Sequence, residues 1–146
     1  MTPVVIALGS NLGDREYNLR RAVDHLRRAV LLVRVSSIHE TAPVDAPAGS
    51  PPFLNMVVAG LAKLGPHDLM GELLAIEKRL GRVRRGRNAP RVIDLDLILY
   101  GAEVIRTRDL VIPHPRYRHR DFVLGPLGEL SLPWHDPQTN LPLEAV

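Results

Sequence analysis

Hydrophobic and polar residues follow two different periods near the N-terminus. The apolar run Val4–Leu8 is short and ends at the polar turn 9–14, which predicts a strand followed by a loop. Over Arg15–Val30, apolar residues recur every three or four positions, the spacing of one helical face, and Asp14 stands where an N-cap is needed. The chain is therefore expected to open with a strand and a helix.

Two more strands and a second helix are expected in the middle of the chain. Leu31–Glu40 is rich in β-branched residues and Leu54–Leu64 is a long apolar stretch, so both predict strands, separated by the irregular proline-rich segment Pro43–Pro52. Pro66 marks the start of the second helix, and Gly81 lies just past its end. Leucine and isoleucine recur at helical spacing between these two residues.

The last third of the chain is expected to contain a further strand, a hairpin and a short helix. Val92–Tyr100 alternates as a strand, and Gly101-Ala102 is expected to turn it into a hairpin with Glu103–Ile105. A short helix is expected over Asp121–Leu130, before an irregular tail.

The order of these elements predicts the fold class. Strand, helix, strand, strand, helix, strand is the order of the split βαβ unit, whose sheet is antiparallel with both helices on one face. We therefore predict an α+β protein with a ferredoxin-like core, arranged as a single domain over residues 1–146. The hairpin and the tail are expected to extend the sheet or to cover its second face, which would complete an α/β/α sandwich.

Composition narrows the class of protein. Of the 146 residues, 45% are apolar and 24% are charged, which is close to the globular average and enough to build a core. The absence of cysteine excludes disulfides and thiol chemistry. The N-terminus lacks a basic, apolar leader and no stretch is as long as a membrane span, so we expect a cytoplasmic protein without a membrane partner.

The charge of the chain favours an anionic partner. The formal net charge is +3, and a polynucleotide or a nucleoside triphosphate would satisfy it equally. Only Lys63 and Lys78 are lysines among the 19 basic residues, so the other 17 are arginines, whose planar forks suit phosphate and carboxylate. A biased genome or a hot habitat would produce the same preference.

The most informative spacing is that of Asp94 and Asp96. Residues two apart on a strand project from the same face, so the two carboxylates can share one cation or hold a pair. Mg²⁺ commonly takes only one or two protein carboxylates together with substrate phosphates, so no third ligand is required. A pair of solvated strand aspartates is the alternative, because the D-x-D pattern is frequent.

Five arginines precede this pair in the loop Gly81–Arg91. A cationic loop beside an acidic metal site suits phosphoryl transfer, because metal ions neutralise bridging oxygens and arginines hold the charge that develops during in-line displacement. A mobile basic loop that binds RNA, or that binds nothing specific, is the alternative.

An aromatic residue and an amide follow the proline-rich segment. Phe53 and Asn55 point the same way if they open a strand, so the ring could stack on a planar heterocycle while the amide reads its edge. Phe122, the only other phenylalanine, would be the partner of Phe53. A core phenylalanine and a turn asparagine are the alternative.

Taken in order, these segments resemble the 6-hydroxymethyl-7,8-dihydropterin pyrophosphokinases of folate synthesis over nearly the whole chain. The matching segments are Gly9-Ser10-Asn11-Leu12-Gly13-Asp14, Glu40-Thr41-Ala42-Pro43, Phe53-Leu54-Asn55, Glu77 with Gly81-Arg82-Val83-Arg84, Ala89-Pro90-Arg91-Val92-Ile93-Asp94-Leu95-Asp96, and Pro113-His114-Pro115-Arg116 with Arg120 and Phe122-Val123-Leu124. Their joint order is far more specific than any one segment.

The resemblance implies a reaction and its cofactor. The β,γ-pyrophosphoryl group of ATP would pass to the hydroxymethyl oxygen of the reduced pterin, giving AMP and the pterin diphosphate. By position, Asp94 and Asp96 would bind two Mg²⁺ ions, while Arg82 and Arg91 would be mobile clamps on the triphosphate. ATP and the pterin would be the partners of a protein that binds no nucleic acid, with a monomer favoured.

The resemblance also implies the binding residues. Phe53 and Phe122 would sandwich the pterin and Asn55 would read its edge, helped by backbone groups near Thr41 and Val44. The positions that match nucleotide-binding residues of the family are Glu77, Arg84, His114 and Arg120. The proline-rich segment and the arginine loop resemble lids that close over the substrates and exclude water.

Some positions depart from the family pattern. Asp45 stands where the family often has glycine, and Asn88 and Ala89 replace an aromatic of the arginine loop. Asp109 and Val111 stand where some members present arginine and threonine to the nucleotide, so those contacts are not implied.

The remaining polar motifs are interpreted as structural. Residues 9–14 lack the Gly-Lys-Ser/Thr ending of a phosphate-binding loop, so a structural turn is expected there. His114 suits a nucleotide contact or a surface cap equally. The other histidines have no ligand spacing and are interpreted as surface residues: His25, His39, His67, His119 and His135.

Two rival functions remain open at this point. A split βαβ domain with a basic loop could bind RNA through its sheet, although Asp94 and Asp96 would repel phosphate without a metal ion. Another Mg²⁺-dependent nucleotide transferase could use the same pair of aspartates, and its nucleotide product would differ.

Overall fold

The computed structural model describes residues 1–43, 48–83 and 89–143. In chain order its elements are β1 (Thr2–Ser10), α1 (Arg15–Leu26), β2 (Val30–Val35), β3 (His39–Thr41), β4 (Phe53–Ala62), α2 (Pro66–Arg79), β5 (Asp94–Tyr100), β6 (Ile105–Arg106), β7 (Val111–Ile112), a 3₁₀ turn (Tyr117–His119) and α3 (Asp121–Glu129). Within the described residues, no helix has the length and apolar character needed to cross a bilayer.

The main sheet has the strand order β2-β4-β1-β5, and β3 also pairs with β4. Every pairing is antiparallel. With α1 between the first two strands in sequence and α2 between β4 and β5, this is the topology of the split βαβ unit. The predicted α+β, ferredoxin-like class is therefore confirmed.

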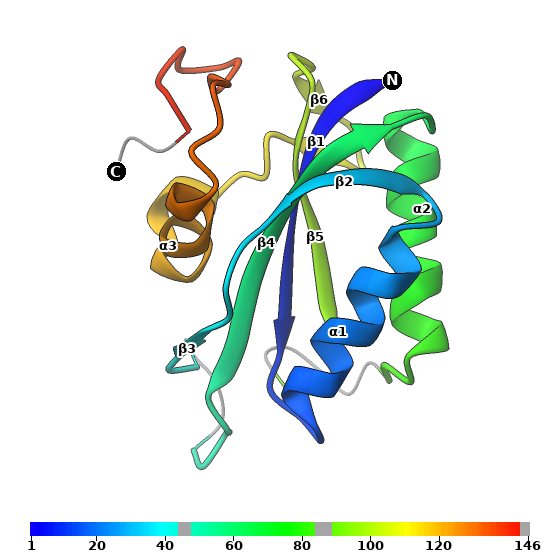
Figure 1. Ribbon diagram of the computed structural model, residues 1–146, viewed down its shortest axis with the longest axis vertical. Helices are drawn as coiled ribbons and strands as arrows, with labels where there is room; N and C mark the ends of the chain where they lie inside the picture. Colours follow the sequence, from blue (N-terminus) through cyan, green and yellow to red (C-terminus); the bar gives the residue numbers. More distant parts are fainter. Residues whose placement is uncertain (44–47, 84–88, 144–146) are drawn as a thin grey trace.

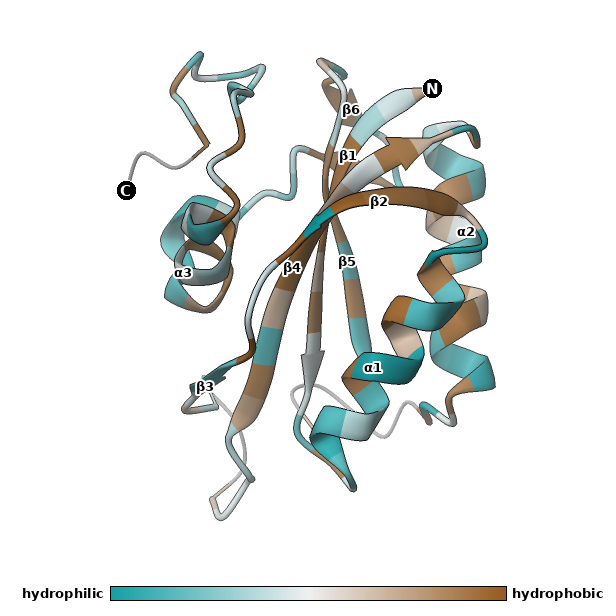
Figure 2. Ribbon diagram, viewed as in Figure 1, coloured by the Kyte–Doolittle hydropathy of each residue, from teal (hydrophilic) through white to brown (hydrophobic). Residues whose placement is uncertain are grey.

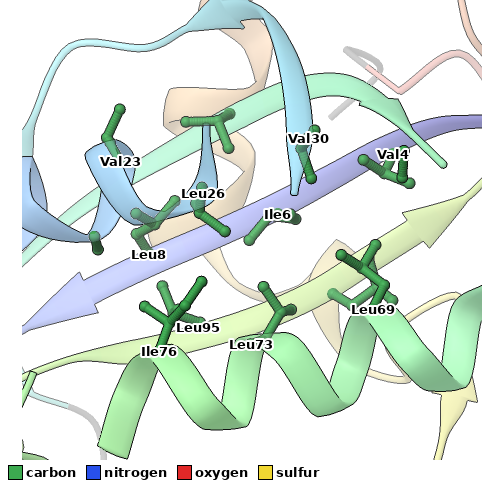
Figure 3. Packing of buried hydrophobic residues seen from close by; sticks show 14 of the residues in the cluster. Val4, Ile6, Leu8, Val23, Leu26, Val30, Leu69, Leu73, Ile76 and Leu95 are labelled. Atoms are coloured by element: carbon green, nitrogen blue, oxygen red, sulfur yellow. The ribbon is translucent and has the colours of Figure 1, made fainter. Parts of the chain in front are cut away.

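The first face of the sheet packs against α1 and α2, which lie on the same side of it (Figure 1). Leu26 of α1 and Leu73 and Ile76 of α2 are fully buried with Ile6 and Leu8 of β1 in one cluster (Figure 3). Burying each such side chain contributes roughly 1.5–3 kcal/mol relative to leaving it exposed. Teal and brown segments alternate along both helices in Figure 2, as expected for amphipathic helices.

The second face is covered by α3, on the opposite side of the sheet (Figure 1). Val123 and Leu127 of α3 belong to a second buried cluster with Val5 and Val57 of the central strands. Leu143, from the tail, is buried in the same cluster. The tail thus covers the second face, as predicted, and completes the α/β/α sandwich.

The N-terminal helix and the strand after it have different limits from those predicted. Asp14 caps α1 by accepting a hydrogen bond from the Tyr17 N–H at 3.1 Å, as expected, but the helix ends at Leu26 because Val30 already pairs with Ala62 in the sheet. Segment 31–40 contains two strands rather than one.

Buried Ser36 separates these two strands. Its N–H donates to the Val57 carbonyl and its Oγ accepts from the Val57 N–H, both at 2.9 Å. The Ser36 hydroxyl thereby replaces one main-chain group in the hydrogen bonding of the sheet, and β2 and β3 both pair with β4.

The hairpin predicted after β5 is wrong. β6 pairs with β7 in a separate two-stranded sheet, and the turn at Gly101 instead brings its N–H to the Pro3 carbonyl at 2.7 Å. Leu110 and Ile112 are buried in the first core, so β7 is the strand that pairs with β6, whereas the predicted hairpin required β5 in that position.

The register of the sheet positions the polar residues of the site. Asn55 on β4 faces Gly9 on β1, and Gly9 faces Asp94 on β5. Facing residues of antiparallel strands project to the same side of the sheet. Asp96 faces Ala7, which belongs to the cluster beneath α3, so these side chains lie on the α3 side.

Candidate active site

A pocket of about 720 Å³ opens on the α3 side of the sheet. Its walls come from β1, β3, the first residues of β4 and β5, and the segment that leads into α3. The lining residues are Ala7, Leu8, Gly9, Thr41, Ala42, Phe53, Asn55, Arg91, Asp94, Asp96, Arg116, His119, Arg120, Asp121 and Phe122.

Asp94 and Asp96 form an acidic wall of this pocket. Both come from β5, where their two-residue spacing places them on one face, as predicted. Burial, and then repulsion from the Asp94 carboxylate, raises the pKa of Asp96 to about 7, although Arg120 acts in the opposite direction. The second carboxylate thus ionises with difficulty unless further positive charge arrives.

Two arginines neutralise Asp94. Arg82 Nη1 donates to Asp94 Oδ1 at 2.8 Å, and Arg91 Nη1 donates to Asp94 Oδ2 at 3.4 Å. Both guanidinium groups are largely buried, with 11% of the Arg82 side chain and 21% of the Arg91 side chain exposed. In this state the arginines predicted to clamp phosphate bind a carboxylate predicted to hold metal.

Glu77 supports Arg82 from α2. Its Oε2 accepts from Arg82 Nη1 at 2.6 Å and from the Leu95 N–H at 2.8 Å. Burial raises the pKa of Glu77 in spite of these two hydrogen bonds. Glu77 does not line the pocket, and its described contacts orient Arg82; the nucleotide contact that the resemblance implies for Glu77 stays a prediction.

Two aromatic rings line the pocket from different elements. Phe53 is the first residue of β4 and Phe122 lies in the first turn of α3, and both are half-buried. The Arg91 guanidinium lies 5.9 Å from the centre of the Phe53 ring and that of Arg120 lies 5.5 Å from the centre of the Phe122 ring, within cation–π range. Each ring therefore lines the pocket and lies beside a cation.

Asn55 is oriented beside the Phe53 ring. It is buried, and its Nδ2 donates to Thr41 Oγ1 at 2.6 Å. Gly9 lies directly beneath this pair, because a Cβ built at Gly9 would come within 3.1 Å of Asn55 Oδ1 and 3.3 Å of Phe53 Cδ1. A residue with a Cβ at position 9 would require the amide and the ring to shift by a few tenths of an ångström.

His114 lies close enough to Arg120 for the guanidinium charge to affect the protonation of the imidazole. Burial, and then the positive charge of Arg120, lowers the pKa of His114 to about 4, so the imidazole is neutral at pH 7. Its Nδ1 accepts from the Arg116 N–H at 3.4 Å, which leaves Nε2 as the donor. His114 itself does not line the pocket.

The structure gathers most of the residues singled out in the sequence. Eight of them line the pocket: Thr41, Phe53, Asn55, Arg91, Asp94, Asp96, Arg120 and Phe122. Arg82 contacts the pocket residue Asp94, and Val44 and Arg84 lie outside the described residues. Among the residues described, no cluster of three or more metal-binding side chains is present.

Several lining residues escaped the sequence-based prediction. Arg116 stood in a matching segment without an assigned role, and His119 was interpreted as a surface residue. Gly9 belongs to a motif interpreted as a structural turn. The signal for Gly9 and Arg116 was their place inside segments that match the family, whereas nothing in the sequence marked His119.

The arrangement suits a defined combination of ligands. The acidic wall can hold a hard divalent cation, the arginines can bind phosphate, and the rings with the amide can bind a flat polar heterocycle. All of these groups meet in one pocket.

Comparison with known proteins places the chain in one family of enzymes. Residues 5–132 match the family model of 7,8-dihydro-6-hydroxymethylpterin-pyrophosphokinase (HPPK). The chain is 48% identical over 127 residues to the 2-amino-4-hydroxy-6-hydroxymethyldihydropteridine pyrophosphokinase of Bacillus subtilis, covering 86% of this chain and 75% of that protein.

Longer relatives match over only part of their length. The mitochondrial folate synthesis bifunctional protein of Arabidopsis thaliana is 46% identical over 128 residues, which cover 87% of this chain but 23% of that protein. The crystal structure of Plasmodium falciparum HPPK-DHPS with pteroate aligns over 97% of this chain and 41% of that chain, with a TM-score of 0.75 and 14% identity. The structural match shows a shared fold.

Proposed function

Because the chain belongs to the 7,8-dihydro-6-hydroxymethylpterin-pyrophosphokinase family, we propose that it transfers the β,γ-pyrophosphoryl group of ATP to the hydroxymethyl oxygen of 6-hydroxymethyl-7,8-dihydropterin. The products are AMP and the pterin diphosphate, and the step belongs to folate biosynthesis. One observation carries the proposal: a single pocket joins an acidic pair, arginines, two aromatic rings and an oriented amide.

The pterin binds at the aromatic wall in this proposal. Phe53 and Phe122 hold the faces of the ring system, since a flat polar heterocycle gains from stacking between aromatic side chains. Asn55 reads the edge of the pterin, and its hydrogen bond to Thr41 fixes the orientation of the amide. The arginines above the two rings would then move aside or lie against the phosphates.

Asp94 and Asp96 are the residues that would hold Mg²⁺. The pair fits a divalent cation, because the raised pKa of Asp96 means that burial and the neighbouring carboxylate oppose its ionisation. Mg²⁺ commonly completes its shell with water and substrate phosphates, so two carboxylates suffice. When bound, Mg²⁺ would supply positive charge to the phosphate oxygens during transfer.

Arg82 and Arg91 exchange partners when the substrates bind. Both hold Asp94 in the structure described here, at 2.8 Å and 3.4 Å. A cation at Asp94 would compete with these contacts and release the two guanidinium groups toward the triphosphate. Bidentate hydrogen bonds from arginine are suited to the charge that develops on the transferred group.

The reaction can be tested with purified protein, ATP, Mg²⁺ and the reduced pterin alcohol, with chromatography of both products. The pterin diphosphate and AMP should form only when all components are present, and EDTA should abolish them. Asp94→Ala should abolish turnover in a protein that remains folded. Formation of ADP, or the lack of turnover by folded wild-type protein, would overturn the proposal.

A further inference from the structure

The loop between β1 and α1 is fixed firmly to α1. Asp14 caps the helix, and Asn18 Nδ2 donates to the Leu12 carbonyl at 3.0 Å and lies 3.4 Å from Ser10 Oγ. Ser10 and Asn11, both polar, are almost fully buried, with 0% and 1% exposed. The loop is therefore a rigid part of the structure, which agrees with the expected structural turn but does not explain the buried amide of Asn11.

The Asn11 side chain binds the main chain of two distant segments. Its Oδ1 accepts from the Arg91 N–H at 2.8 Å, and its Nδ2 donates to the Pro51 carbonyl at 3.3 Å. The Asn11 N–H also donates to the Arg91 carbonyl at 3.1 Å, so Arg91 is held at both its amide and its carbonyl. These partners lie 80 and 40 residues away in sequence.

Both segments lead directly into the pocket. Arg91 extends its guanidinium to Asp94 and over the Phe53 ring. Pro51 lies two residues before Phe53, and the neighbouring Pro52 carbonyl accepts from Arg15 Nη1 at 2.9 Å. The same rigid loop thus holds the main chain that carries an arginine and the main chain that carries a ring.

We propose that Asn11 is a positioning residue that couples the phosphate-binding Arg91 to the pterin-binding Phe53 by holding the main chain of both segments on one rigid loop. This inference rests on the proposed function for the roles of Arg91 and Phe53. Correct placement of such groups matters, because a displacement of about 1 Å in a positioned group is sufficient to slow a reaction on the order of 100-fold.

Two substitutions separate the contacts of Asn11. Asn11→Ala removes both side-chain hydrogen bonds, so we expect kcat to fall about 10- to 100-fold and the KM for pterin to rise, while the equilibrium affinity for ATP changes less than about threefold. Asn11→Asp keeps an acceptor for the Arg91 N–H but opposes the Pro51 carbonyl with a carboxylate. Its kcat should stay closer to wild type while its KM for the pterin rises.

Asn18→Ala is the matched control, because Asn18 stabilises the same loop without contacting Arg91 or Pro51 in any hydrogen bond described above. It should lower Tm with little selective effect on kcat. Equal losses of kcat in Asn11→Ala and Asn18→Ala at equal losses of Tm would overturn the inference, since a merely structural role predicts that result.

Hydrogen exchange of the Arg91 amide, followed by NMR, tests the coupling without relying on turnover. Exchange should accelerate at least tenfold in Asn11→Ala and remain near the wild-type rate in Asn18→Ala. An unchanged rate in Asn11→Ala would refute the positioning role. Failure of the proposed function would be recognised separately, because wild-type protein would then form no pterin diphosphate whatever the exchange rates.

Discussion

The charge on Asp96 depends on its surroundings more than on its residue type. The carboxyl is buried beside Asp94, and its pKa of about 7 lies well above the ordinary value of about 3.9. Asp94, by contrast, is neutralised by the two arginines that contact it. The two carboxylates on one strand thus have different surroundings, and a divalent cation would displace the proton that Asp96 holds below about pH 7 as it binds.

This difference predicts opposite effects on stability when each of the two aspartates is replaced by asparagine. Between about pH 4 and 7, Asp96 is deprotonated in the unfolded chain but keeps its proton in the folded protein. The stability that this proton contributes is therefore complete below about pH 4 and is lost as the pH rises through 7. Asp96→Asn should therefore raise Tm at pH 8 in EDTA, with a smaller gain at pH 5, while abolishing turnover.

Asp94→Asn is the control, and it should lower Tm because it removes the negative charge that pairs with Arg82 and Arg91. Differential scanning fluorimetry at both pH values measures the two variants side by side. A lower Tm for Asp96→Asn than for wild type at pH 8 would contradict this account of the acidic wall.

The two phenylalanines give a second test at the level of single residues. Phe53→Ala and Phe122→Ala should each weaken pterin binding by about 1–3 kcal/mol, because each removes a stacking surface, and should leave ATP affinity largely unchanged. Isothermal titration with the pterin and with an ATP analogue separates the two ligands, beside a thermal melt. A destabilised protein with unchanged pterin affinity would show that the rings serve only the core.

The sequence predicts residues whose chemistry is local and misses those whose role depends on distant contacts. Asp94 and Asp96 were found because their spacing alone places them on one face. Gly9 and Asn11 carry no reactive group, and their importance comes from partners brought close only by the fold. A single sequence without its fold offers no means of pairing Asn11 with Arg91.

Among the elements, α3 is joined by polar contacts to β3 and to Ser37, which lies just before β3. Glu129, the last residue of α3, accepts from the Ser37 N–H at 3.0 Å and from Ser37 Oγ at 2.6 Å, and it also pairs with His39 of β3. β3 carries Thr41 and α3 carries Phe122. The contact therefore links two walls of the site.

We expect Glu129→Gln to weaken pterin binding severalfold and to cost less than about 1 kcal/mol of stability, because the contact is exposed to solvent. The hydrogen bonds from Ser37 lower the pKa of Glu129 to about 2. The contribution of Glu129 to folding stability is therefore present above about pH 4.5 and is lost as the pH falls toward 2.

Glu72→Gln on α2 is the matched control, since Glu72 forms a surface ion pair with Arg79 away from the pocket lining. Titration of both variants with the pterin at pH 7 measures the effect. Equal affinities in the two variants would show that the β3–α3 contact does not shape the site.

The long elements follow from periodicity, whereas the short ones do not. α1, α2, β4 and β5 each contain enough repeats for the apolar pattern to define them. The separation of β2 from β3 depends on Ser36 meeting Val57, and the pairing of β6 with β7 depends on the burial of Ile112 in the first core. Both are long-range contacts that no local pattern specifies.

At the scale of the whole molecule, the two faces of the sheet have different tasks. The first face is devoted to the core beneath α1 and α2, while the second is shared between the core beneath α3 and the pocket. RNA-binding split βαβ domains use an open sheet face, but here Val57 and Ala59 on that face are fully buried. The arrangement favours a small-molecule enzyme over the RNA-binding alternative.

The central claim is that the two terminal phosphates of ATP move as one unit, and the β-phosphorus of ATP reports on this most directly. With ATP labelled at the β-phosphorus, we predict that the label enters the pterin product at the same rate as a γ-label and that the AMP is unlabelled. An ordinary kinase would leave the β-label in ADP, and a nucleotidyltransferase would release it as pyrophosphate. Recovery of the β-label in ADP or in free pyrophosphate, with none in the pterin, would contradict the account.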